Sequence, residues 1–419
     1  MSECLKSRVP TPSWADLPQE IWLHIFRLAT STPTSHEDCE LQYSPFRTIS
    51  FLDRDWSSMQ VTLNVKRTIV RVCKAWRVLA MEVMFEIVRI RHGTEGLQKG
   101  LEKSGEELGV DAYGRWIRRV EISPQIIDFD PLNPVEIPEI LRRCTQAGIL
   151  VRPYITPTGN YPLSPARFAP DRHFPFLPAL KRIDWWTPPD SPPTSASERH
   201  EFLDDLLRNS PNLSYLSLGD GSAFLASVHP NRYTDSHAII LPSLTTLRLE
   251  SQTEPLYRRI LHWSLPRLTH LILNPGQFQL STELLMVFGS QLHVVELMWC
   301  NIVYHRECFK QILRQCPNLR ELNYHVDTAF PPPIVLASHQ NLQCIRLHLR
   351  PNSLASDKVL AFVMTHFGMF AGHSLPAFER IVLYGSWNPI LSDHRFHSWK
   401  RDLPDCSCVI ELSDGTKVR

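Results

Sequence analysis

Two stretches of the chain, LLRNSPNL at residues 206–213 and ILRQCPNL at residues 312–319, are nearly identical and decide how the chain folds. In each, a helix-like apolar pattern ends at a proline and leads into a leucine that begins a second pattern, L-x-x-L-x-L. From residue 180 onward, successive copies of the second pattern start 23 to 36 residues apart. Recurrence at such an interval indicates an array of repeated structural units. The copies are IRRVEI (117–122), LKRIDW (180–185), LSYLSL (213–218), LTTLRL (244–249), LTHLIL (268–273), LHVVEL (292–297), LRELNY (319–324), LQCIRL (342–347) and FERIVL (378–383).

Two further marks define the repeating unit. A proline stands two residues before the first apolar position in most copies, at Pro178, Pro211, Pro242, Pro266, Pro317 and Pro376. Between the copies, apolar residues are spaced three and four apart, which is typical of a helix. The unit is therefore helix, turn and short strand, and stacked units form a parallel sheet on one side and a helical layer on the other. We predict an α/β solenoid with a parallel sheet over residues 91–400.

The residues between the apolar strand positions point to the opposite face of the sheet, because side chains alternate along a strand. On the concave face of a solenoid they form a candidate surface for a protein substrate, since they combine both charges, histidine and aromatic groups. For most of them taken singly, a solvated sheet face is the alternative interpretation. The candidate substrate-facing residues are Arg182, Trp186, Tyr215, Arg248, Glu250, His270, Glu296, Glu321, His325, Arg346, His348, Arg380 and Tyr384.

A proline-rich insertion interrupts the early repeats at residues 151–193, where eleven prolines disfavour a helix and remove amide donors from a sheet. The helical pattern at residues 137–144 just before it ends like the one at residue 312, so we interpret it as a degenerate repeat. Residues 1–13 are expected to form an N-terminal tail. Residues 401–419 are expected to form a C-terminal tail or a capping strand.

The N-terminal helix predicted at residues 17–30, LPQEIWLHIFRLAT, has more apolar surface than one core requires. Its apolar side chains span roughly 200° of the helical wheel, whereas a surface helix buries a stripe of about 100°. A second surface should cover the excess. A second helical pattern, residues 65–87, has an ordinary core stripe, and residues 31–64 between the two patterns are expected to be a loop insert.

These two segments resemble the F-box. In that family, L-P-x-E-[IL]-x-x-x-I-F begins one helix and V-C-[KR]-x-W-[RK] lies in a later one. The chain supplies LPQEIWLHIF at residues 17–26 and VCKAWR at residues 72–77. The resemblance implies a small helical domain at residues 14–90 that docks on the Skp-type adaptor of a cullin–RING ubiquitin ligase. The adaptor-binding candidates it implies are Leu17, Pro18, Ile21, Trp22, Ile25, Phe26, Val72, Cys73 and Trp76.

The repeats themselves resemble irregular leucine-rich repeats, which commonly follow an F-box and bind the substrate. The combined resemblance implies the substrate-recognition subunit of an SCF-type ubiquitin ligase. The alternative is an F-box-containing interaction scaffold that does not support ubiquitin transfer. Neither function requires catalytic residues.

Composition and motifs favour a non-enzymatic protein. The formal net charge is +1, so no strong field recruits nucleic acid. No apolar run reaches the roughly 20 residues of a membrane span. The N-terminal residues lack the apolar segment of a secretory signal, so we expect the ten cysteines to lie in a reducing, intracellular compartment, cytoplasmic or nuclear. Cys300, Cys308 and Cys316 are expected to be core positions. Motifs for nucleophilic, metal-dependent and phosphate-binding catalysis are absent from the sequence, and we expect no cofactor or metal.

Overall fold

The computed structural model of the chain describes most of the solenoid and part of the N-terminal region. The described residues are 17–31, 43–46, 56–90, 94–108, 113–122, 137–152, 173–187, 196–220, 238–250, 254–274, 278–298, 305–326, 338–349, 360, 367, 375–402 and 408–418.

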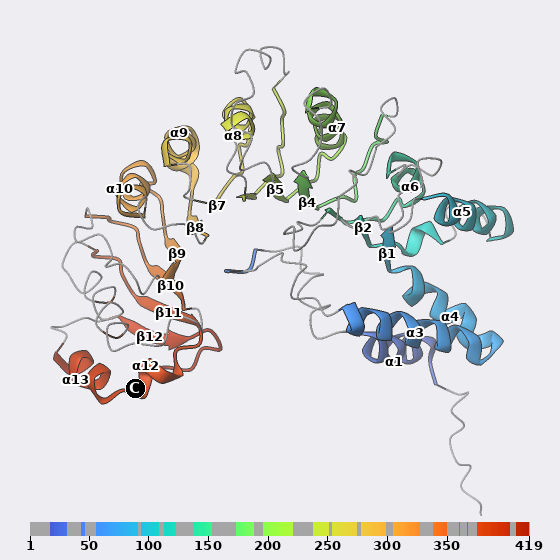
Figure 1. Cartoon of the computed structure of the whole chain (residues 1–419), viewed down its shortest axis with the longest axis horizontal. Coiled ribbons are helices and arrows are strands. Elements are labelled where there is room, and N and C mark those ends of the chain that lie inside the picture. The colour runs from blue at the N-terminus through green and yellow to red at the C-terminus, as the bar shows by residue number, and fades with distance from the viewer. Residues whose placement is uncertain are drawn as a thin grey trace, which may run out of the picture.

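Within these residues, twelve strands form one parallel sheet in which each strand pairs with its neighbours in sequence. The sheet curves into an arc with the strands on the inner side, as Figure 1 shows. All nine predicted L-x-x-L-x-L segments contribute a strand, so the parallel α/β architecture is confirmed. The strands are β1 (Ile87–Ile90), β2 (Arg119–Ile122), β3 (Ile149–Arg152), β4 (Arg182–Thr187), β5 (Tyr215–Asp220), β6 (Thr246–Leu249), β7 (His270–Leu273), β8 (Val294–Leu297), β9 (Glu321–Val326), β10 (Cys344–Leu349), β11 (Arg380–Gly385) and β12 (Val409–Leu412).

Helices cover the outer side of the arc (Figure 1). They connect successive parallel strands, as a parallel pairing requires a crossover. No helix in the described part of the chain is long and apolar enough to cross a lipid bilayer. The helices of the solenoid are α5 (Glu95–Leu108), α6 (Ile137–Arg143), α7 (Ala196–Arg208), α8 (Glu254–Ile260), α9 (Phe278–Phe288), α10 (His305–Gln315), α12 (Asn388–Leu391) and α13 (His394–Asp402), with short 3-10 turns η3 (Gly114–Trp116) and η6 (Gly289–Gln291).

In the repeats that carry it, the proline lies in a β-turn that leads into the strand. The amide of Leu213 donates to the carbonyl of Ser210 at 3.2 Å, and that of Leu319 donates to Cys316 at 3.0 Å. The proline between them occupies the second turn position, where its fixed φ is favourable and its missing N–H is not needed. This explains why proline precedes the leucine by two residues.

Asparagine side chains tie neighbouring turns together. Asn212 Nδ2 donates to the carbonyl of Pro178 at 2.9 Å, and Asn341 Nδ2 donates to that of Pro317 at 2.8 Å. Asn318 makes the corresponding bond to Ser290 at 2.7 Å. The shared P-N-L sequence of the two quoted stretches therefore encodes contacts between repeats as well as the turn itself.

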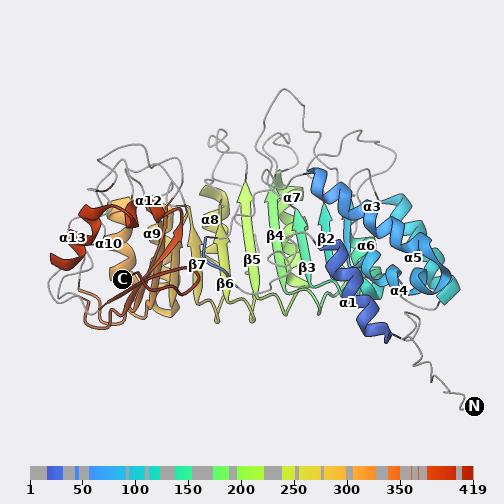
Figure 2. The ribbon, with the colours of Figure 1, turned by 90° about the horizontal axis from the view of Figure 1, so that it is seen from below.

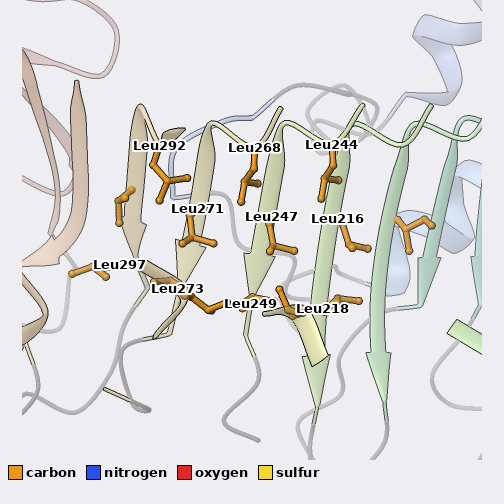
Figure 3. Packing of buried hydrophobic residues seen from close by; sticks show 14 of the residues in the cluster. Leu216, Leu218, Leu244, Leu247, Leu249, Leu268, Leu271, Leu273, Leu292 and Leu297 are labelled. Carbon is orange, nitrogen blue, oxygen red and sulfur yellow. The ribbon is translucent and has the colours of Figure 1, made fainter. Parts of the chain in front are cut away.

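Rows of leucines between the sheet and the helices form the core (Figure 3). Leu216, Leu247 and Leu271 are register partners on adjacent strands, and each is fully buried. Replacing such a side chain by alanine costs about 2–5 kcal/mol. The apolar positions of the repeat therefore stabilise each unit through its neighbours.

At the N-terminal end of the arc, α1 (Gln19–Thr30), α3 (Trp56–Val72) and α4 (Lys74–Phe85) form a helical unit with its own small core (Figure 2). Phe26, Ile69, Ala80 and Val83 are buried within it. Helix α4 leads directly into β1, and the carbonyl of Glu86 accepts hydrogen bonds from the amides of the β2 segment. The helical unit therefore continues into the first strand.

Three predicted boundaries differ from the structure. The helix expected at residues 65–87 is two helices, because Cys73 has an extended backbone and its Sγ accepts from the amide of Trp76 at 3.4 Å as the N-cap of α4. The loop expected at residues 31–64 includes the start of α3, so residues 56–64 are helical. The sheet also begins inside the range 14–90, since β1 pairs with β2.

Strands also extend into both ends of the proline-rich range 151–193. Residues 151–152 complete β3, and β4 lies at residues 182–187. Residues 153–172 and 188–193 fall outside the described residues, as does the expected tail at residues 1–13. At the other end of the chain, β12 pairs with β11, in agreement with the capping-strand alternative for residues 401–419.

Candidate functional site

Three aromatic side chains, from α1 and α4, pack against one another inside the N-terminal helical unit. The Phe26 ring lies 5.0 Å from that of Trp76 and 5.8 Å from that of Trp22, measured between ring centroids, and Trp22 lies 5.0 Å from Trp76. Phe26 is fully buried, while the two tryptophans are half-buried. Three of the nine adaptor-binding candidates therefore pack within the unit itself.

The outer side of α1 presents an apolar stripe. Ile21, Ile25 and Leu28 are 45%, 37% and 56% exposed, and their spacing of four and three residues places them on one face of the helix. The wide apolar arc of the sequence is thus divided between a buried face and an exposed one. The remaining candidates Pro18, Val72 and Cys73 are exposed, and Leu17 is half-buried.

Among the described side chains of this unit, three large exposed apolar residues are not candidates, namely Leu28, Val61 and Val78. Leu28 follows the helical spacing of Ile21 and Ile25, so periodicity alone could have identified it. Val61 lies in the part of α3 that was expected to be a loop. The F-box motif does not mark Val78, so nothing quoted from the sequence signals its exposure.

On the concave face, the outward positions of the strands align in rows across the sheet. The central row is made of residues that are register partners from strand to strand. It contains charged, polar and apolar side chains. It consists of Arg89, Glu121, Val151, Asp184, Ser217, Arg248, Ile272, Glu296, Asn323, Arg346, Val382 and Glu411. This row therefore mixes both charges along the described strands, which suits a phosphate backbone poorly.

Most charges of this face are paired within it. Arg182 Nε lies 2.9 Å from Asp184 Oδ2, and the Arg182 guanidinium also lies 4.5 Å from the centroid of the Tyr215 ring. Arg248 pairs with Glu250, and Arg346 pairs with Glu321. Because these arginines already have carboxylate partners, their charge is partly neutralised before any ligand arrives.

The candidate substrate-facing residues differ in accessibility. Arg182, Trp186, Tyr215, Arg248 and Glu296 are buried. Arg380 is exposed and lies 3.5 Å from Glu411, measured between Nη1 and Oε1. The half-buried candidates are Glu250, His270, Glu321, His325, Arg346, His348 and Tyr384.

Trp186 lies flat against the sheet because its register partner is glycine. A Cβ at Gly219 would come within 2.3 Å of the Trp186 ring. The tryptophan therefore acts as part of the concave floor.

The half-buried candidates gather toward the C-terminal half of the sheet. His325 and His348 are register partners with ring centroids 4.7 Å apart, and Tyr384 is the partner of His348 on β11. Glu296 and Asn323 are neighbours in the central row beside them. This group, Glu296, Asn323, His325, His348 and Tyr384, is called the C-terminal cluster below.

Burial shifts the pKa values of groups in and beside this cluster. It raises the pKa of the Glu296 carboxyl above its ordinary value, although Arg248 and Arg346 act in the opposite direction. It lowers the pKa of His270 to about 4, and the nearby His293 acts in the same direction. His270 is therefore neutral at pH 7.

Residues 43–46 of the long insert also lie on the concave face, in contact with the C-terminal cluster (Figure 1). The sequence does not indicate this contact, because it joins residues about 250 positions apart. No local period or spacing encodes such a long-range contact.

Comparison with known proteins adds no assignment, since no protein-family model and no curated protein sequence matches the chain. In the described part of the chain, no group of three or more His, Cys, Asp or Glu side chains is arranged to hold a metal ion. The two surfaces described above, the apolar stripe of α1 and the concave face, are the features on which a function must rest.

Proposed function

We propose that the chain is the substrate-recognition subunit of an SCF-type cullin–RING ubiquitin ligase. Helices α1, α3 and α4 dock on a Skp-type adaptor, and the concave face of the repeats binds a protein substrate. The chain contributes no catalytic group in this function. It holds the substrate near a charged ubiquitin carrier, so proximity and orientation accelerate transfer.

The observation that carries the proposal is the exposed stripe of Ile21, Ile25 and Leu28 on a helix whose opposite face is already packed. Complete burial of an isoleucine or leucine contributes about 1.5–3 kcal/mol. Because these three residues are about half exposed, covering all three would gain roughly half of that for each, a useful part of a stable interface. The same helix carries the LPQEIWLHIF sequence that resembles the F-box. The mixed, internally paired charges of the concave face suit a protein ligand.

Co-purification with a Skp-type adaptor tests the docking surface. The variant Ile25→Asp places a charge in the middle of the stripe and should abolish co-purification, and Leu17→Ala with Pro18→Ala should do the same. Val287→Asp is the matched control, because Val287 is similarly exposed on α9, away from the helical unit. Equal recovery of adaptor with Ile25→Asp and Val287→Asp would contradict the proposal.

Ubiquitin transfer distinguishes a ligase subunit from a scaffold. Partners captured by the full chain should be ubiquitinated when the adaptor, the cullin–RING subunits and a charged ubiquitin carrier are added. Ile25→Asp should capture the same partners without their modification. Adaptor binding without any modification of captured partners would favour the scaffold alternative.

A further inference from the structure

Residues 43–46, Tyr-Ser-Pro-Phe, occupy the C-terminal cluster although they belong to the stretch between α1 and α3. The short segment lies inside the arc of the sheet in Figure 1. Its contacts extend from His270 on β7 to Tyr384 on β11. The segment therefore crosses several strands of the proposed substrate-binding face.

The tyrosine of this segment is bound through hydrogen bonds of its hydroxyl group. Tyr43 Oη donates to Glu296 Oε2 at 2.6 Å and accepts from Asn323 Nδ2 at 2.6 Å. Its ring lies 5.0 Å from that of His270. The hydroxyl is thus satisfied both as a donor and as an acceptor, by two side chains that are themselves buried.

The phenylalanine is held by aromatic contacts of its ring and by a hydrogen bond of its backbone amide. The Phe46 ring lies 5.1–5.2 Å from those of His325, His348 and Tyr384, and only 8% of the residue is exposed. Its amide donates to Glu296 Oε2 at 3.0 Å. The aromatic wall thus encloses the ring while one carboxylate oxygen holds the backbone.

Phe46 also has a φ of 58°, in the left-handed region that residues other than glycine seldom adopt. Such a conformation persists only where the surrounding contacts determine it, and it is most frequent at binding and switching sites. Here the contacts are those of the C-terminal cluster. Without these contacts, nothing would offset the energetic cost of the left-handed conformation at Phe46.

Glu296 Oε2 therefore accepts two hydrogen bonds from the segment, one from the Tyr43 hydroxyl and one from the amide of Phe46, three residues later. Glu296 and Asn323 are 1% and 0% exposed. A buried carboxylate that loses its donors is costly, so any ligand that takes the place of the segment must bring similar groups. This requirement specifies the chemistry of the ligand.

We propose that the C-terminal cluster is a binding site for short peptide segments of the form Tyr-x-x-aromatic with an unmodified tyrosine, and that residues 43–46 are its resident occupant. The proposal rests on the proposed function of the concave face and names the class of substrate segment that the face accepts. A substrate must displace residues 43–46 in order to bind.

The resident segment has the advantage of being in the same chain. Tethering of this kind acts as a local concentration that reaches the millimolar range for short linkers. A free peptide of the same sequence should therefore bind weakly to the wild-type chain and much more tightly once the resident side chains are removed. A phosphate on the tyrosine would face the Glu296 carboxylate and should prevent binding.

The experiment uses the full chain and a fluorescein-labelled peptide with the sequence of residues 41–48, LQYSPFRT. Fluorescence anisotropy measures its dissociation constant for the wild type and for Tyr43→Ala with Phe46→Ala. We expect binding to the double variant to be at least about tenfold tighter. Tyr43→Phe, which removes only the hydroxyl of the resident segment, should give an intermediate gain and serves as the milder variant.

Further substitutions, made in the chain that carries Tyr43→Ala and Phe46→Ala, test which residues form the peptide-binding site. Glu296→Ala and Asn323→Ala should each weaken peptide binding by about tenfold or more, because the first removes the acceptor of the tyrosine hydroxyl and of the Phe46 amide, and the second removes the donor to the tyrosine hydroxyl. Val287→Ala, on an exposed side chain of α9, is the control and should change nothing. The phosphotyrosine peptide and a peptide with alanine in place of tyrosine should not compete.

Equal peptide affinity for the wild type and the double variant would overturn the proposal, as would failure of the peptide to bind the double variant. In either case residues 43–46 would be a structural strap only. These outcomes are separate from those of the adaptor test, because the peptide assay needs no adaptor and Ile25→Asp should leave it unchanged. If the wild-type chain bound the peptide but did not bind the adaptor, the proposed function would be contradicted and the peptide site would stand.

Discussion

Arg27 on α1 donates to Glu82 on α4 at 2.7 Å, in an ion pair that leaves 46% and 32% of the two side chains exposed. The residue before it, Phe26, is fully buried between the same two helices. The ion pair and the aromatic ring thus join the same two helices in different environments.

Alanine variants should separate the two contributions. Phe26→Ala should cost about 3–5 kcal/mol in the stability of the helical unit, since it leaves a cavity beside Trp22 and Trp76. Arg27→Ala should cost less than about 1 kcal/mol, because exposed ion pairs are screened by water. Hydrogen exchange of the α1 amides measures both, and similar losses for the two variants would contradict this ranking.

Gly219→Ala should destabilise the solenoid by about 1–3 kcal/mol, because the new methyl group would collide with the Trp186 ring. Gly100→Ala in α5 is the matched control. Nothing lies within 4 Å of a Cβ at that position, so alanine should stabilise the helix by about 1 kcal/mol. Thermal unfolding of the two variants should therefore shift in opposite directions.

Acid should destabilise the fold through His270. Its pKa is about 4 in the folded chain against an ordinary value of 6.5, so between these values the unfolded state binds more protons. Stability should therefore fall as the pH falls from about 6.5 to about 4. Burial is the main cause of the lowered pKa; His293 and Arg346 also disfavour the charged form, whereas a hydrogen bond with the Thr245 backbone favours it. Thr269 Oγ1 lies 2.8 Å from the His270 Nδ1 atom.

His270→Asn removes this titration, so its stability should change less over the same interval. Denaturant unfolding at pH 7 and pH 5 provides the measurement. A variant with the same loss of stability as the wild type between the two pH values would show that other groups cause it.

Alkylation should distinguish the cysteines. Cys316 is fully buried, and burial raises the pKa of its thiol to about 12, so iodoacetamide should not modify it in the folded chain at pH 8. Cys73 is exposed at the start of α4 and should react before Cys316. Mass spectrometry of the labelled peptides checks the order, and early modification of Cys316 would indicate that the solenoid opens locally.

The sequence was sufficient to predict the repeats because each carries several local signals. An apolar triplet, a turn proline and a helical period agree in most units, and each triplet became a strand. Strand β3 lacks those signals, since Ala147 and Arg152 stand where the first and last apolar residues of the pattern belong. Its existence depends on pairing with β2 and β4, which no local pattern shows.

The candidate surfaces were predicted less completely. Strand alternation correctly placed the outward residues on one face, but it could not show that Arg248 is buried and paired with Glu250. It also could not show that Tyr43 reaches Glu296. Both depend on tertiary packing between side chains, and the second joins residues that are 253 positions apart in the chain.

The position of residues 43–46 in the chain, between α1 and α3, links the two ends of the arc thermodynamically. If a partner bound to the helical unit favours release of residues 43–46 from Glu296, it raises the affinity of the concave face for its ligand. By linkage, a ligand bound first to the concave face then raises the affinity of the helical unit for its partner by the same factor. A ligand in the C-terminal cluster and a partner on α1 would then change each other's affinity by the same factor. Binding on the curved sheet and binding on the helical unit would then be coupled through residues 43–46.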